Sequence, residues 1–351
     1  MNLSEIKITP LLDTLRLQKI SDEEYFSEVY KDYISNSRLG LIDPSNEGSP
    51  EKFLDGLRAN KIFSDSLSLG TVVHEQTLQP DLFNFPPSLN RPTAKVGFIA
   101  DELWKIAKDP LNFTKSEFET ACLTVDYYKG NPSDEKRKEI YPKIQNYFVN
   151  LKNFCDNNDS SKISTFLDDN TLVKAKNCVE ALKNNKKVQN LLHPKGLIDD
   201  PISECEQAIL LDAKVEVSGL DSFIVRLKSK LDNYTIDKES NIITVNDVKT
   251  IGRTLDKCDE QIMKYHYYRE MYMYCYLLIL CAQKFYNMDK FKVRSNFLWV
   301  STLPTCYTKV TPMTQKLFET GKKEFKELLR RAAIALYFKD AVEASTFING
   351  L

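Results

Sequence analysis

The stretch Val245-Asn246-Asp247-Val248-Lys249-Thr250 decides how this chain is expected to fold. It closes a run of β-branched residues that begins at Ile242, and such runs are typical of strands. Residues 237–241 have the composition of a turn, and residues 223–231 alternate apolar with basic side chains. The pattern predicts a hairpin of two strands. Because side chains alternate along a strand, Asp247 and Lys249 point to the same side, roughly 6.6 Å apart, while Val248 points into the core.

A second carboxylate is expected beside this pair. A turn around residues 238–240 brings Asp232 within a residue or two of Asp247 on the neighbouring strand. Two close carboxylates repel each other unless a cation lies between them, and their oxygen atoms suit Mg²⁺ or Mn²⁺. Such an ion, helped by Lys249, supports phosphodiester hydrolysis. In the alternative interpretation both aspartates are solvated at strand ends and the lysine extends to solvent.

Working outward from the hairpin, helices are expected on both sides of a cluster of strands. Hydrophobic spacing predicts, in order, helices within 95–154 and 164–192, strands at 208–211, 215–217, 223–231 and 242–248, a helix at 254–286, a strand at 297–300 and a helix at 313–338. This order indicates an α/β or α+β domain with a central sheet. The proline-rich segment 80–92 and the polar segment 156–162 are the best candidate breaks between parts of the chain.

The composition excludes several classes of protein. The chain has 351 residues, and its 48 Lys plus Arg nearly balance 49 Asp plus Glu, which excludes a uniformly basic protein that wraps nucleic acid. The eight cysteines have no C-x-x-C spacing and are expected to be free thiols in a reducing cytoplasm. The most apolar run, Met271 to Ala282, is far shorter than the ~20 residues of a membrane span, so we expect no membrane association.

Further segments carry patterns that recur together in one group of enzymes. They are Ile34–Leu39 (ISNSRL) followed by Ser49–Phe53 (SPEKF), Leu67–Glu75 (LSLGTVVHE) followed by Leu78–Phe83 (LQPDLF), Tyr265–Glu270 (YHYYRE) with Tyr274, and Gly321–Phe325 (GKKEF) with Leu328 and Leu329. With Asp232 and the D-x-K-T sequence at 247–250, and in this order, they resemble the PD-(D/E)XK nuclease superfamily and, within it, the RecE-type exonucleases (exonuclease VIII) of phages and prophages.

The resemblance implies a fold class and a domain organisation. It implies an α/β fold with a restriction-endonuclease-like core, in which helices flank a central mixed sheet, and a largely helical N-terminal or inserted region. Residues 1–33 would form an N-terminal helical lead-in, and residues 34–345 would form the nuclease domain, with a helical insertion at about 95–192.

The resemblance also assigns roles to individual residues. Asp232 and Asp247 would be metal ligands, Lys249 the catalytic lysine, and His74 a further catalytic residue and metal ligand or an organiser of the site. Glu206 corresponds to an acidic residue that these nucleases carry on their first core strand, although a solvated glutamate at a strand edge is an equal alternative.

The helix that carries the family's Gln-x-x-x-Tyr pattern departs from it. In one register Glu270 replaces the glutamine and is followed by Tyr274, and in an earlier register Gln261 and Tyr265 keep the literal pattern. Glu270 and Tyr274 share a helix face, but a glutamate cannot donate the amide hydrogen bond. The tyrosines of 265–276 either stack on bases at a frayed DNA end or belong to the core.

The function implied is a Mg²⁺- or Mn²⁺-dependent exonuclease that digests double-stranded DNA ends, 5′ to 3′, and leaves single-stranded tails. Its implied partners are a single-strand annealing protein and further copies of the chain in a ring-like trimer or tetramer, in a bacterial or phage-infected cytoplasm. Candidate phosphate-binding groups are Arg226, Lys228 and Lys230, and Lys322, Lys323, Lys326, Arg330 and Arg331, unless these are solvated faces. The alternatives are a single-strand or flap nuclease and a degenerate DNA-binding module.

Overall fold

The computed structural model describes residues 6–56, 64–196 and 199–350. The chain folds into two compact units. The first takes residues 1–60, 185–299 and 308–351, and the second takes residues 61–184 and 300–307. Each unit has its own hydrophobic core.

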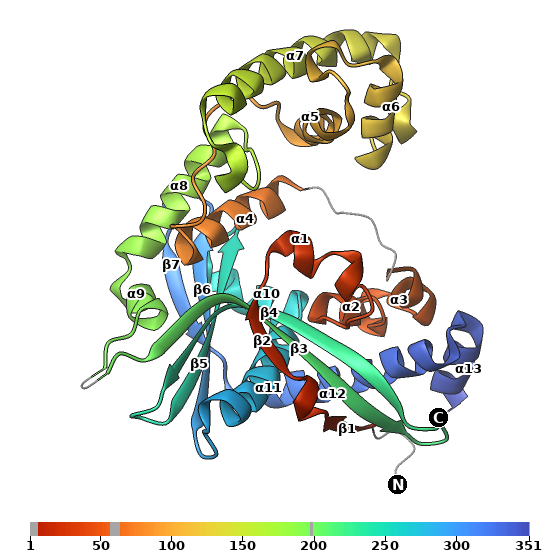
Figure 1. Cartoon of the computed structure of the whole chain (residues 1–351), viewed down its shortest axis with the longest axis vertical. Coiled ribbons are helices and arrows are strands. Elements are labelled where there is room, and N and C mark those ends of the chain that lie inside the picture. The colour runs from red at the N-terminus through yellow and green to blue at the C-terminus, as the bar shows by residue number, and fades with distance from the viewer. Residues whose placement is uncertain (1–5, 57–63, 197–198, 351) are drawn as a thin grey trace. The chain divides into compact units, whose positions relative to one another are not determined.

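A sheet organises the first unit (Figure 1). Within the described residues it has seven strands: β1 (Ile6–Pro10), β2 (Arg16–Lys19), β3 (Ile202–Val217), β4 (Phe223–Asp237), β5 (Ile242–Ile251), β6 (Lys292–Ser301) and β7 (Thr308–Pro312). Their order is β1-β3-β4-β5-β6-β7, and β2 also pairs with β3. The pairs from β1 to β5 are antiparallel, so the sheet is a meander at its centre.

The predicted hairpin is confirmed as β4 and β5. Asn233 pairs with Asn246, and the pairing runs from there to Asp237 and Ile242 beside the turn. The Asp237 carboxylate accepts the backbone N–H of Ser240 at 3.0 Å, which fixes the turn locally. The register is therefore set by the turn chemistry at 237–241, as the sequence indicates.

Buried amides hold the central strands in this register. Asn246 Nδ2 donates to Asn233 Oδ1 at 2.8 Å, and Asn296 Nδ2 donates to Asn246 Oδ1 at 3.0 Å. All three side chains are buried, and an interior polar group left without a partner is costly. A slip of β4, β5 or β6 would break these amide hydrogen bonds, which therefore fix the strand register beside Asp232 and Asp247.

Helices flank the sheet of the first unit. They are α1 (Asp22–Tyr25), α2 (Asn36–Gly40), α3 (Pro50–Gly56), α9 (Lys186–Leu192), α10 (Cys258–Lys264), α11 (Tyr267–Tyr286), α12 (Gln315–Phe338) and α13 (Ala341–Gly350). The apolar side of α11 and α12 joins the sheet residues in one core. The helix expected over 254–286 is divided at His266, whose φ of 53° is left-handed.

The N-terminal part differs from the expected helical lead-in. Residues 6–19 form β1 and β2, and the helix after them, α1, has four residues. The reason is that apolar and polar side chains alternate here with the period of two that is typical of a strand. Ile6 and Ile8 pack on the core, while Lys7 between them pairs with Glu216 on the outer face. A helix would have spread these residues around its circumference.

The second unit is helical, as expected for this part of the chain. It contains α4 (Asp65–Leu78), α5 (Ala94–Ile106), α6 (Lys115–Thr124), α7 (Asp134–Asn157) and α8 (Asp169–Asn184). The buried Phe118, Tyr147 and Phe148 form its core. The proline-rich segment 80–92 lies inside this unit and not between units, and α9, within the expected insertion 95–192, belongs to the first unit.

The fold class is mixed α/β, with a helical region before a mixed open sheet and helices against the sheet. In the described part of the chain, no helix combines the length and the apolar character that a bilayer crossing requires.

Candidate active site

Two aspartates lie opposite each other where β4 and β5 separate. Asn233 and Asn246 are the last paired residues at this end, and the next positions along the two strands are Asp232 and Asp247. Asp232 Oδ2 accepts the backbone N–H of Val248 at 2.7 Å. This carboxylate thereby replaces a strand carbonyl as acceptor, which fixes the orientation of the side chain.

Lys249 lies with Asp247, as the alternation of the strand predicts. Its Nζ is 2.9 Å from Asp247 Oδ2 and 3.2 Å from Glu270 Oε2, which comes from α11. The hydroxyl of Tyr274 donates to Glu270 Oε1 at 3.0 Å. The sequence offered two matches to the Gln-x-x-x-Tyr pattern. The residues of one match, Glu270 and Tyr274, contact Lys249 directly and through Glu270, whereas Gln261 of the other match lies on α10, before the helix break at His266.

Glu206 lies on β3 opposite Asp232. Cys205 pairs with Asn233 and Gln207 pairs with Leu231, so the register is the same on both sides of Glu206. At Glu206 itself φ is 56°, a strained conformation for a residue with a side chain. One of its carboxylate oxygens lies within 4.8 Å of a carboxylate oxygen of Asp232, and its Oε2 pairs with Lys230 Nζ at 2.8 Å. Glu206 therefore adds a third carboxylate beside the two aspartates.

Burial dominates the electrostatics of this site. It raises the pKa of Asp232 to about 7, with Lys249 opposing the rise and Glu206 adding to it. Burial also raises the pKa of Asp247 well above its usual value, against the effect of Lys249. The ammonium of Lys249 behaves oppositely: burial favours its neutral form, but Asp247, Glu270 and Asp232 outweigh burial and hold its pKa well above the usual value.

The residues present fit a divalent cation. Asp232, Asp247 and Glu206 offer carboxylate oxygens, the ligands that Mg²⁺ and Mn²⁺ prefer. Around Lys249 the carboxylates outnumber the ammonium, and burial together with the neighbouring carboxylates raises the pKa of both aspartates. A bound cation would oppose that rise.

His74 lies on α4, in the second unit. Its predicted role beside the aspartates of the first unit therefore stays a prediction.

The expected basic contacts are only partly available. Lys228 is buried, donates to the carbonyl oxygen of Tyr25 at 2.6 Å and lies 4.3 Å from the centroid of that ring. Lys230 pairs with Glu206, and Arg330 is buried against Glu327. The alternative of a solvated side chain is wrong for Lys228 and Arg330, which are buried, and Lys230 is held by the site carboxylate Glu206. Phosphate binding by the basic residues stays a prediction.

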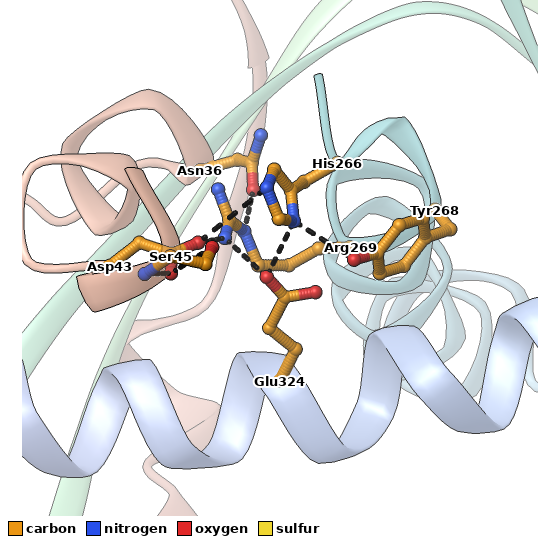
Figure 2. Close-up of polar contacts among 7 residues, drawn as sticks. All are labelled: Asn36, Asp43, Ser45, His266, Tyr268, Arg269 and Glu324. Atoms are coloured by element: carbon orange, nitrogen blue, oxygen red, sulfur yellow. Dashed lines mark hydrogen bonds and ion pairs between the residues drawn. The ribbon is translucent and has the colours of Figure 1, made fainter. Parts of the chain in front are cut away.

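Sequence reasoning missed a polar network that joins α2, α11 and α12 (Figure 2). Arg269 Nη1 donates to Asp43 Oδ2 at 2.7 Å and to Glu324 Oε1 at 3.0 Å. Arg269 Nε donates to Asn36 Oδ1 at 2.8 Å, and His266 Nδ1 lies 2.7 Å from Glu324 Oε1. We call these five residues the α11–α12 polar network. Its members lie within or beside segments that carry the resemblance, but no spacing rule joins them.

The geometry of Asp43, His266 and Glu324 also suits a metal, since one ligand atom of each lies within 4.8 Å of the others. However, the Arg269 guanidinium already binds both carboxylates there. An always-charged arginine in that position supplies the cation, so we assign this cluster a structural role.

Comparison with known proteins leaves the family open. No protein-family model matches the chain, and no curated protein matches it. Among solved structures, it is similar to a protein from Eubacterium rectale whose crystal structure is named "Putative exonuclease". The two share 10% identity at a TM-score of 0.48, over 92% of this chain and 88% of the other. This similarity does not decide the activity of the chain.

Proposed function

We propose that this chain is a divalent-metal-dependent nuclease that hydrolyses phosphodiester bonds of DNA. The observation that carries the proposal is the meeting of Asp232, Asp247 and Lys249 at the point where two strands separate. A protein that only bound DNA would gain nothing from clustered carboxylates facing phosphate. A metal nuclease needs them.

In this proposal each residue has one task. Asp232 and Asp247 hold Mg²⁺ or Mn²⁺, with Glu206 and His74 as further ligands. When bound, the metal supplies positive charge and lowers the pKa of a coordinated water. The neighbouring carboxylates raise the pKa of Lys249, which favours an ammonium that offsets charge on the phosphoryl oxygens. Glu270, held by Tyr274, fixes the direction of the ammonium.

The finer assignment rests on the sequence resemblance to RecE-type exonucleases. It gives double-stranded DNA ends as the substrate, 5′ to 3′ polarity, single-stranded tails as the product and a single-strand annealing protein as partner. The ring-like homo-oligomer and the cytoplasm of a bacterium or an infected host belong to the same assignment.

Digestion of end-labelled linear and closed-circular duplex DNA tests the proposal. The unmodified chain is expected to digest linear DNA with Mg²⁺ and to be inactive with EDTA, and Asp247→Asn is expected to be inactive with both. Glu216→Gln is the matched control, because that surface carboxylate on β3 pairs with Lys7 outside the site. Absence of digestion with both Mg²⁺ and Mn²⁺ would overturn the proposal. Digestion of circular DNA, or of single strands and flaps alone, would retain the nuclease and replace the exonuclease assignment.

A further inference from the structure

A cavity of about 510 Å³ lies at the start of α11. Asn36 and Ser37 of α2 form part of its wall, and Lys264, Tyr265 and Tyr267 form another part. Glu270, the partner of Lys249, also lines it. All these residues belong to the first unit, so the cavity and the candidate active site lie in the same compact unit and share Glu270.

The kink at His266 creates an aromatic pair in this cavity. In a continuous helix, residues two apart point in different directions. Here the left-handed φ of His266 redirects the chain, and the rings of Tyr265 and Tyr267 lie 5.6 Å apart with planes only 30° from parallel. The two rings therefore form one stepped aromatic surface.

The α11–α12 polar network holds this kink in place. His266 is tied to Glu324, and the next turn of the helix is tied through Arg269 to Asp43 and Asn36 (Figure 2). Arg269 has a side-chain exposure of 3%, so its hydrogen bonds are shielded from water. The aromatic surface is therefore formed before any ligand arrives, which lowers the entropic cost of binding.

The two tyrosines have different surroundings. Tyr267 packs near Phe297 and Trp299, and its ring centroid lies 4.7 Å from Lys249 Nζ. Tyr265, in contrast, is 49% exposed. The surface thus runs from the catalytic ammonium to an exposed ring, with Lys264 Nζ 5.2 Å from the centroid of that ring.

We infer that this cavity binds an unpaired nucleobase of the DNA strand that is cut, stacked on Tyr265. The inference rests on the proposed nuclease function and adds a substrate feature to it: the end of the duplex must be opened by at least one nucleotide. Base stacking on aromatic rings suits every base, so this cavity would not require a particular base. Tyr267 supports the stacking ring and lies between it and Lys249 along this surface, and Lys264 supplies a positive charge beside Tyr265 for a backbone phosphate.

Fluorescence of 2-aminopurine at the terminal position of a duplex tests this directly. The Asp247→Asn chain in Mg²⁺ is expected to bind this DNA and to change the fluorescence of the terminal base. Adding Tyr265→Ala is expected to abolish the change and weaken binding by about 5- to 150-fold, the range for loss of one base–aromatic stack. Tyr265→Phe keeps the ring and is expected to restore both. Tyr337→Ala, which removes a half-exposed tyrosine of α12 outside the cavity, is the control.

Two results separate this inference from the proposed function. If the otherwise unmodified chain digests DNA and Tyr265→Ala leaves KM, kcat and the fluorescence change unaltered, the base-binding inference is overturned and the nuclease stands. If the unmodified chain does not digest DNA but Tyr265 governs the fluorescence change, the nuclease proposal is overturned and base binding stands.

Discussion

The candidate active site and the α11–α12 polar network each take one residue from the first turn of α11, Glu270 and Arg269 respectively, and are built from similar residue types. In both, carboxylates from separate elements converge on one basic side chain. In the network, burial alone would raise the pKa of Asp43, but hydrogen bonds from Ser45 and Arg269 lower it below its usual value. In the active site, burial prevails and the pKa values of Asp232 and Asp247 rise.

The difference lies in how the negative charge is compensated. Arg269 Nη1 contacts Asp43 Oδ2 and Glu324 Oε1 together, so one always-charged guanidinium pairs with both carboxylates. Lys249 is a point charge that contacts Asp247 and Glu270, while the carboxylate of Asp232 accepts the backbone N–H of Val248. A cluster that holds its own cation stabilises the fold, whereas a cluster left with excess negative charge can hold a metal ion.

The largest expected effect is on catalysis. Asp232→Asn keeps an oxygen that can accept the Val248 N–H but removes the charge that a metal needs. We expect a loss of at least about 10²- to 10³-fold in kcat, the scale for removal of one charge-stabilising group. Mg²⁺ titration of initial rates and of Tm checks it. Unchanged activity and an unchanged Mg²⁺ midpoint would show that the two clusters do not differ in this way.

The next effect concerns the network. Arg269→Leu leaves Asp43 and Glu324 without their shared cation, and breaking a buried ion pair costs about 3–5 kcal/mol. Urea unfolding measures this loss, and Mg²⁺ should not restore it. The control is Arg331→Gln, which removes a partly exposed pair with Glu327 and is expected to cost about 1 kcal/mol or less. Recovery of Arg269→Leu in Mg²⁺ would place a second ion site in the network.

The raised pKa of Asp232 gives a pH dependence with a definite sign. An unfolded aspartate loses its proton near pH 4, whereas Asp232 in the fold loses it near pH 7. Between these values the folded chain holds the extra proton, so its free energy of unfolding falls as pH rises, by on the order of 4 kcal/mol. The fall is expected in EDTA, between pH 4 and 7, and not in saturating Mg²⁺, which favours the ionised carboxylate.

The difference in Tm between the unmodified chain and Asp232→Asn isolates this effect from other groups that titrate. In EDTA the unmodified chain should lose Tm relative to the variant as pH rises. A relative gain instead would mean that Asp232 is stabilised as a carboxylate without any ion.

The strand pattern was the most predictable part of the molecule. The β-branched residues after Ile242 and the turn residues 237–241 define the hairpin, and the hairpin brings Asp232 opposite Asp247. These relations are local, since a turn and a period of two determine them. The contact of Lys249 with Asp247 follows from the same period.

The network and the kink were not predictable in this way. Asp43, Arg269 and Glu324 are far apart in the sequence, and only the packing of α11 against α12 and against the segment after α2 brings them together. The helical spacing of apolar residues continues through His266, so it predicts one helix where the backbone makes two. The left-handed backbone conformation of Glu206 was likewise not predictable, because nothing in the sequence marks such a residue inside a strand.

The smallest expected effect tests whether the network depends on the approach of the two helices. A Cβ at Gly321 of α12 would lie 2.4 Å from the carbonyl oxygen of Tyr268 on α11, so an alanine must push the helices apart. We expect Gly321→Ala to lower the free energy of unfolding by about 1–3 kcal/mol. The same shift moves Glu324, one turn further along α12, away from Arg269.

The β4–β5 carboxylates are not on either helix, so the Mg²⁺ midpoint should stay unchanged in Gly321→Ala. Gly350→Ala, with open space around its Cβ, is the control. A changed Mg²⁺ midpoint in Gly321→Ala would show that the polar network sets the geometry of the metal ligands as well as that of the helices.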